Sequence, residues 1–214
     1  MSVHYGAAGA ATARAVAFLV AGWSGCFIMS LELLSSRVLA PYFGSSVFVW
    51  GGILAVFMAA LALGYLLGGA LSTESPRLWK LAGLLSAEAL LTLPVMASDG
   101  VLENLSLLVP DPRYGSLLGS LLLFGLPTVI TGTISPYTIR LLVKGVRTSG
   151  REAGLVYFVS TLGSAAGTIT TAFYLVLWLD IHQILLVMVG ISLAIAGLAV
   201  CLSPRLVMQE DGHA

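Results

Sequence analysis

The sequence predicts an all-α polytopic membrane protein with six transmembrane helices and no soluble domain. Of its 214 residues, 58% are hydrophobic and only 9% are charged, and the mean hydropathy is +0.99. So few charged side chains cannot cover a soluble domain of this length, whereas a surface in contact with lipid requires few. The hydrophobic residues also gather in six runs, each long enough to cross a bilayer core of about 30 Å as a helix.

Each predicted span is an apolar run of roughly 20 or more residues bounded by charge, Gly or Pro. The runs are residues 15–38, 46–71, 80–99, 115–142, 153–178 and 182–202. Residues 179–181 separate the last two, which predicts a tight helical hairpin at the membrane surface. Residues 100–114 combine leucines with Glu103 and predict a short helix lying on the membrane. Residues 1–214 are therefore predicted to form one transmembrane domain.

The predicted orientation follows from the basic residues, because loops rich in Lys and Arg stay in the cytoplasm. Arg37 and Arg113 fall on one side of the predicted bundle. The other eight fall on the opposite side: Arg14, Arg77, Lys80, Arg140, Lys144, Arg147, Arg151 and Arg205. We therefore expect both termini in the cytoplasm and the loops near Pro41, Pro110 and Asp180 on the outer side.

Small residues four positions apart predict where the helices pack, because helices in lipid approach most closely where side chains are small. The glycine pairs of this kind are Gly64 and Gly68, Gly115 and Gly119, and Gly163 and Gly167. We expect these pairs to pack against other helices of the same chain. Pro94, Pro127 and Pro136 fall inside predicted spans and predict kinks there.

Two carboxyl groups fall inside predicted spans, where an ionisable side chain costs at least about 2.5 kcal/mol to insert. Glu32 shares a face of the first span with Gly25 and Ser36, so we expect it to point toward other helices. Glu88 lies close to the middle of the third span. Each is a candidate proton- or cation-binding group. The alternative is a structural hydrogen bond or, for Glu32, an ion pair with Arg37.

A polar stripe runs along the fifth predicted span. Tyr157, Ser160, Ser164 and Thr168 recur at steps of three and four residues and so share one helix face. Two interpretations remain open. The Ser and Thr hydroxyls bond back to the carbonyls of their own helix, or they line a water-filled pathway.

The sequence carries no motif for catalysis. It has no H-E-x-x-H metal motif and no glycine loop of the kind that cradles phosphate. Cys26 and Cys201 lie in apolar segments near opposite ends of the chain, which argues against a disulfide framework or a metal site. No basic run is long enough to indicate nucleic-acid binding. We expect no enzymatic activity, no metal and no cofactor.

Four segments resemble one known family. Residues 30–46 (SLELLSSRVLAPYFGSS), followed by Trp50, resemble the segment that opens the membrane domain of bacterial spermidine synthase-like membrane proteins. Residues 64–69, 134–141 and 160–168 are similar to the family's later segments and follow in its order. The resemblance covers nearly the whole chain. It implies a multi-pass protein of the bacterial cytoplasmic (inner) membrane.

The family's membrane domain is similar to half of a major facilitator transporter, so the resemblance implies a half-MFS-like bundle, without the soluble synthase domain that many relatives carry. Facilitator transporters bind substrate between two six-helix halves. A parallel homodimer of this chain, embedded in the lipid bilayer, would supply both halves. The expected substrate is a small organic cation, polyamine-like or a related amine, carried with or without proton coupling.

This hypothesis assigns roles to the candidate residues. Those predicted to bind substrate or proton are Glu32, Glu88, Arg37, Tyr42, Trp50 and Tyr157, and those predicted to line the pathway are Ser160, Ser164 and Thr168. The aromatic side chains would contact a cation through their ring faces. The alternative is a membrane anchor or regulatory subunit for a separately encoded spermidine synthase-like or methyltransferase-like protein, docked on residues 140–151.

Overall fold

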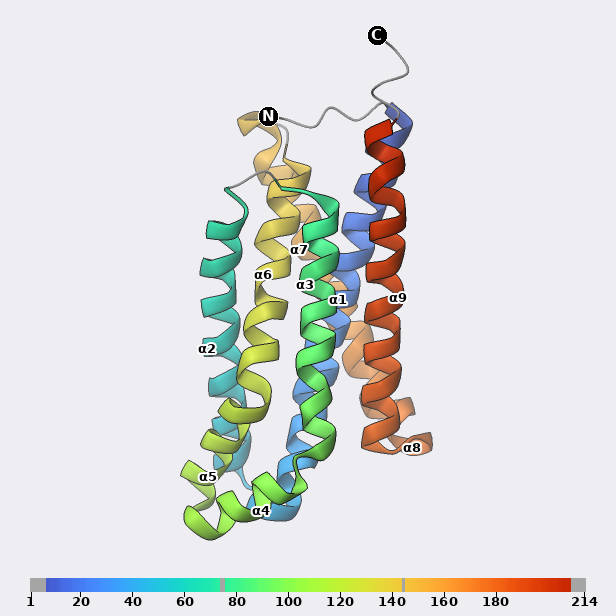
Figure 1. Ribbon diagram of the computed structural model, residues 1–214. Coiled ribbons are helices and arrows are strands. Elements are labelled where there is room, and N and C mark those ends of the chain that lie inside the picture. The colour runs from blue at the N-terminus through green and yellow to red at the C-terminus, as the bar shows by residue number, and fades with distance from the viewer. Residues whose placement is uncertain (1–6, 74–75, 144, 209–214) are drawn as a thin grey trace.

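The computed structural model describes residues 7–73, 76–143 and 145–208, which form helices joined by short turns (Figure 1). The α-helices are α1 (Ala7–Phe43), α2 (Val47–Leu71), α3 (Leu78–Thr92), α4 (Asp99–Leu108), α5 (Pro112–Ser120), α6 (Leu126–Leu142), α7 (Val146–Thr170), α8 (Val176–Trp178) and α9 (Ile181–Met208). A 3₁₀ segment, η1 (Leu93–Ala97), and two π segments, η2 (Leu121–Gly125) and η3 (Thr171–Leu175), continue three of them. Both ends of the predicted domain, Lys144 and the side chain of Arg205 lie outside the described residues.

Six helices of the length and composition predicted for membrane spans are present in the described part of the chain. The helices long and apolar enough to cross a membrane are Ala11–Phe43, Val47–Leu71, Leu78–Ala97, Pro112–Leu142, Val146–Trp178 and Ile181–Ser203. The fifth begins at Val146 rather than at residue 153, because the helix continues through Arg147 and Arg151, whose charged heads extend beyond the apolar run. The short helix predicted in residues 100–114 is present as α4.

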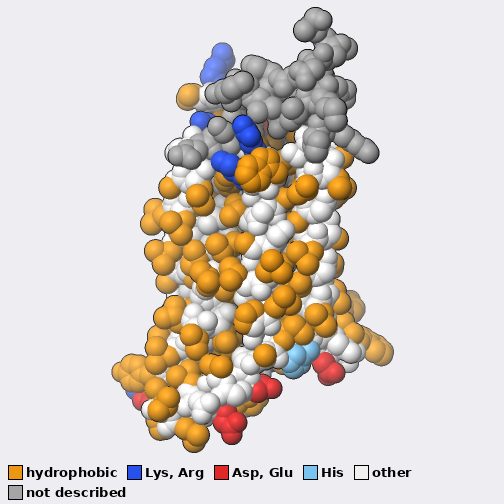
Figure 2. All heavy atoms as spheres, in the orientation of Figure 1, with side chains coloured by type: hydrophobic (Ala, Val, Ile, Leu, Met, Phe, Trp, Pro, Cys, Tyr) orange, Lys and Arg blue, Asp and Glu red, His pale blue; other side chains and the backbone are white. Residues whose placement is uncertain are grey.

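On the face of the bundle that Figure 2 shows, charged side chains lie at the two ends. Figure 2 shows a face covered by hydrophobic side chains along its length, with Lys and Arg near one end and carboxylates with a histidine at the other. We call the first the basic end, where α1 and α7 begin, and the second the α4 end. A long surface without charge between two charged ends is what a bilayer requires.

The spans pack in a definite pattern of neighbours. Three pairs of helices pack along each other: α1 with α7, α2 with α6, and α3 with α9. Two further contacts join these pairs, that of α3 with α6 and that of α1 with α9. The first and fourth spans are central, since 56% of the most apolar stretch of each is buried. The share is 39% for the second, third and sixth spans and only 11% for the fifth. The fifth span, which contains α7, therefore leaves most of its surface uncovered.

The predicted glycine pairs all lie against other helices of the chain, as expected. Gly64 and Gly68 of α2 face the backbone of α6, and Gly115 and Gly119 of α5 face side chains of α1. In α7, Gly163 lies against Gly22 and Gly167 lies against Cys26 of α1. In most of these places a side-chain carbon would overlap its neighbour, so glycine sets the separation of the helices.

The turn between the first two spans is fixed by one glycine. Gly44 follows the last residue of α1 with φ of 79°, a left-handed conformation that costs glycine nothing. Its N–H donates to the carbonyl of Ala40 at 2.9 Å. α1 therefore continues past Pro41 and ends at Phe43, and its last two turns place Arg37 and Tyr42 at the α4 end.

Candidate functional site

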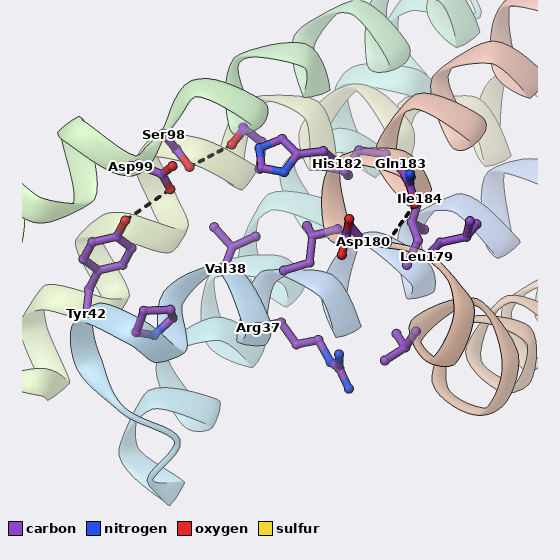
Figure 3. A pocket seen from close by; sticks show the side chains of 15 residues that line it. Arg37, Val38, Tyr42, Ser98, Asp99, Leu179, Asp180, His182, Gln183 and Ile184 are labelled. Carbon is purple, nitrogen blue, oxygen red and sulfur yellow. Dashed lines mark hydrogen bonds between the residues drawn. The ribbon is translucent and has the colours of Figure 1, made fainter.

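A cavity of about 510 Å³ opens at the α4 end of the bundle. Three parts of the chain form it: the last turns of α1, the junction of η1 with α4, and the segment that joins α8 to α9. Its polar side chains are those of Arg37, Tyr42, Ser98, Asp99, Asp180, His182 and Gln183 (Figure 3). The volume is within the range of small-molecule sites, about 300–1,000 Å³.

Hydrogen bonds between helices hold the rim of this cavity. The Tyr42 hydroxyl on α1 donates to Oδ1 of Asp99 on α4 at 3.1 Å (Figure 3). Nε2 of His182 on α9 lies 2.9 Å from the carbonyl oxygen of Met96 in η1. A carbonyl can only accept, so Nε2 carries the proton in this contact. Together the two bonds tie η1 and α4 to helices on both sides.

The local sequence explains why Asp180 stands at the cavity. It precedes α9, its carbonyl accepts the N–H of Ile184 at 3.0 Å, and its N–H donates to Oε1 of Gln183 at 3.1 Å. This is the reciprocal half of a capping box, in which a side chain three residues on satisfies the backbone at the helix start. The Asp180 carboxylate makes no hydrogen bond to the described residues and stays available to a ligand.

The charges of the cavity are unbalanced. It contains two carboxylates, Asp99 and Asp180, and one guanidinium, Arg37. In the described part of the chain, the ion pair found within 4 Å is that of Arg14 with Glu152, far from the cavity at the basic end. Arg37 is exposed and is not paired with either carboxylate. The ion pair with Arg37, which was the structural alternative for Glu32, is likewise not formed.

Glu32 lies at a different place, on a column of α1 that begins at Gly25 and continues to Leu39 at intervals of seven residues. Residues seven apart share a helix face. Gly25 lies against the backbone of Ser160 in α7, and Leu39 lies against Gly119 in α5. Glu32 therefore points into the seam between α7 and α5. Its side chain is partly exposed there and has no hydrogen-bond or ion-pair partner among the described residues.

Tyr157 lies on the same open side of the bundle. It is 56% exposed on α7, and Tyr65 of α2, 49% exposed, is close enough to interact with it electrostatically. α2 and α7 thus border an open face of the bundle, and α1 and α6 lie between them. We call this the α2/α7 face.

The polar stripe of α7 bonds mainly to its own helix. The Ser164 hydroxyl donates to the carbonyl of Ser160 at 3.1 Å, and Thr168 donates to that of Ser164 at 2.9 Å. One turn on, Thr171 donates to Oγ of Ser30 on α1 at 2.8 Å. The first of the two interpretations therefore describes these bonds, although Ser160, Ser164 and Thr168 all stay partly exposed.

Glu88 is a residue of α3 and is completely buried between this helix and its neighbours. Its side chain is 0% exposed, and neither carboxyl oxygen has a hydrogen-bond partner. Thr131 of α6 approaches the carboxyl, but its hydroxyl donates to the carbonyl of Pro127 at 2.9 Å. The hydroxyl of Thr128, one turn away, is also buried without a partner. Among the described residues, Glu88 thus faces the Thr131 hydroxyl of α6 rather than a cation.

The predicted site residues fall into three places rather than one. Arg37 and Tyr42 share the cavity at the α4 end, Glu32 and Tyr157 belong to the α2/α7 face, and Glu88 lies inside the bundle. Trp50, partly buried near the start of α2, lines neither the cavity nor that seam.

Three titratable residues of the cavity were not predicted as site residues from the sequence: Asp99, Asp180 and His182. Asp180 carried one local signal, the capping box with Gln183. Nothing in the sequence places Asp99 beside α9, because only packing brings the two segments together.

Comparison of the chain with protein-family models, with curated proteins and with solved structures finds no match. The family resemblance stays a prediction.

Proposed function

We propose that this chain is one half of a secondary transporter, and that two copies, parallel in the membrane and facing each other across their α2/α7 faces, carry a small organic cation. The basic end would lie in the cytoplasm, in keeping with the distribution of Lys and Arg. The observation that carries the proposal is Glu32, a partly exposed, unpaired carboxyl in the first membrane span, beside the least covered helix.

A partly exposed carboxyl inside a membrane span must be shielded from the lipid. Exposure of an ionisable group to hydrocarbon costs several kcal/mol, so such groups face a bundle interior or a water-filled cavity. In a single copy the seam at Glu32 is open, and α7 is covered on one side only. A second copy seated on the α2/α7 face would enclose Glu32, Tyr65 and Tyr157 in a shared cavity with two carboxyls. Such a cavity favours a cation, and the tyrosine rings would contact it through their faces.

The pattern of neighbouring helices supports a transporter half. Each half of a facilitator transporter consists of two inverted three-helix repeats. If spans 1–3 and 4–6 are such repeats, the contact of span 1 with span 5 is equivalent to that of span 4 with span 2. The contact of span 1 with span 6 is equivalent to that of span 4 with span 3. All four contacts are present, and spans 3 and 6 pair with each other.

The π segments supply places where the spans can bend. η2 and Pro127 interrupt the regular bonding of the fourth span, and η3 interrupts the fifth near its end. Interruptions of this kind produce kinks and are frequent at functional sites. Both lie in spans that border the α2/α7 face, so bending there would change access to Glu32.

Pairing of copies is tested by the oligomeric state of two matched variants. Ala165 on α7 and Ala194 on α9 are both exposed in the single chain. We expect Ala165→Trp to convert a dimer to monomers in mass photometry or crosslinking of reconstituted protein, and Ala194→Trp to leave the dimer intact. A wild-type protein that is strictly monomeric in lipid would overturn the proposal and favour the anchoring role.

Transport is tested by flux of a labelled diamine into proteoliposomes, with and without a pH gradient. We expect Glu32→Gln to reduce the flux at least tenfold. Glu103→Gln, which removes an exposed carboxyl of α4 outside the α2/α7 face, is the matched control and should transport like the wild type. Flux that is unaffected by Glu32→Gln, or absent in wild-type dimers, would contradict the mechanism.

A further inference from the structure

The cavity at the α4 end is a second place where the chain presents unused charge to a ligand, and it does not belong to the α2/α7 face. We propose that it binds a small, water-soluble amino acid with a second amino group, such as a diamino carboxylic acid. Its carboxylate would pair with Arg37, and its two ammonium groups would pair with Asp99 and Asp180. This inference is independent of transport and of pairing between copies.

The position of the charged groups supports a ligand with separated charges. In Figure 3, the hydrogen-bonded pair of Tyr42 with Asp99 lies on one side of the cavity, Asp180 lies on the other, and Arg37 lies below them. A ligand with two ammonium groups joined by several methylenes can offer one ammonium group to each carboxylate. Because both carboxylates stand apart from the guanidinium, none of the three charges is already neutralised by another.

The net charge of the cavity decides the class of ligand. Two carboxylates and one guanidinium together leave one negative charge in the cavity. A ligand with two ammonium groups and one carboxylate complements all three charges. A diamine leaves Arg37 without a partner, and a monoamino acid leaves one carboxylate without a partner.

The remaining lining suits the methylene chain between the charged groups. Val38, Val95 and Ile184 line the same cavity and offer apolar contacts between the polar groups. A few polar groups that fix orientation on an otherwise apolar lining are typical of small-molecule sites. The cavity also lies where the spans end, and Arg37, Asp99, Asp180 and His182 are all exposed, so the ligand would enter from water.

The stability of the rim favours a site that exists before the ligand arrives. The bonds from Tyr42 to Asp99 and from His182 to Met96 hold three segments at fixed positions. Little ordering would then be required on binding, which preserves affinity for a small molecule.

Three probes of the same chain length test the charge requirements. These are L-lysine, 1,5-diaminopentane, which lacks the carboxylate, and 6-aminohexanoic acid, which lacks one ammonium. Dissociation constants would be measured calorimetrically on the full chain in nanodiscs of phosphatidylcholine, whose headgroup has no primary amine. We expect lysine to bind about tenfold more tightly than either of the other two, since each lacks one charge-assisted contact.

Variants assign each contact to a residue. Arg37→Gln should weaken lysine to the level of 1,5-diaminopentane without changing the binding of the diamine. Asp180→Asn or Asp99→Asn should weaken lysine about tenfold and remove its advantage over 6-aminohexanoic acid. Glu103→Gln and Arg113→Gln are the controls, because both remove a charge at the same end outside the cavity, and both should bind lysine like the wild type. Unfolding midpoints equal to that of the wild type would establish that all five variants are folded.

Several results would overturn this inference. The inference is wrong if lysine binds no more tightly than the other two probes, or does not bind at concentrations up to about 10 mM. It is also wrong if the cavity variants bind lysine like the controls. Phosphatidylethanolamine that copurifies with the wild type and is lost in Asp180→Asn, without lysine binding, would assign the cavity to a lipid headgroup instead. Because the assay requires neither flux nor a dimer, its outcome is separate from that of the transport experiments.

Discussion

Replacement of Gly163 by Ala should separate the two most closely packed helices of the bundle. A Cβ at position 163 would overlap the backbone of Gly22 on α1, with the carbonyl carbon 2.7 Å away and the oxygen nearer still. Real Cβ atoms stay beyond 3.0 Å of such neighbours, and here the neighbour is backbone rather than a flexible side chain. α1 and α7 must therefore move apart.

The magnitude follows from how far the helices move. A separation of about 0.5–1 Å forfeits a quarter to a half of the dispersion energy at each contact along the interface. Overpacking of this kind typically costs about 1–3 kcal/mol. The cost is not shared with other helices, because α7 packs along α1 and has few other neighbours. We therefore expect Gly163→Ala to reduce the free energy of unfolding by roughly 2 kcal/mol.

The assay is reversible unfolding by SDS in mixed micelles, followed by circular dichroism. The matched control is Gly190→Ala in α9, also a glycine within a membrane span, where an added Cβ meets no atom within 4 Å. It should unfold like the wild type or slightly later, since Ala favours the helix over Gly. If Gly163→Ala costs no more than Gly190→Ala, then close backbone contact does not hold α1 and α7 together, and the explanation offered for the glycine pairs is incorrect.

Three further predictions use the same unfolding assay. Glu88→Met should raise the free energy of unfolding by about 1–3 kcal/mol, because it removes a buried carboxyl without a partner; unchanged or lower stability would mean that the carboxyl has a partner after all. Tyr137→Phe should lower the free energy of unfolding by about 1–2 kcal/mol. The reason is that the Tyr137 hydroxyl accepts a hydrogen bond from the N–H of Arg77 at 2.9 Å and donates one to the carbonyl of Arg77 at 3.3 Å. An unaffected midpoint would show that this bridge between the α2–α3 loop and α6 is dispensable. Arg14→Gln should cost about 1–3 kcal/mol by leaving the buried carboxyl of Glu152 unpaired. Adding Glu152→Gln should recover part of that loss in a double-mutant cycle, and additive losses would refute the coupling.

Much of the fold could be predicted because lipid imposes a simple rule on sequence. Every backbone polar group in hydrocarbon must be satisfied, so each apolar run of sufficient length is a helix, and six runs give six spans. The close contacts at Gly163 and Gly167 could also be foreseen, because only small residues allow two backbones to approach in lipid. Both predictions depend on local composition alone.

The candidate site could be predicted only in part, for the opposite reason. Arg37 and Tyr42 lie on adjacent turns of α1 and were identified together, but Asp99 and Asp180 join them from segments about 80 residues apart in sequence. No periodicity relates those segments, because their approach depends on how α3 and α9 pack at the α4 end.

The same limit applies to Glu32 and Glu88. The sequence alone determined that both carboxyls fall inside membrane spans, since their depth follows from the length of each apolar run. Only the tertiary structure decided that Glu88 is buried beside Thr131 of α6 while Glu32 stays partly exposed in a seam between α7 and α5. A helix pattern gives the direction of a side chain relative to its own axis, but the neighbour in that direction is set by packing between distant parts of the chain.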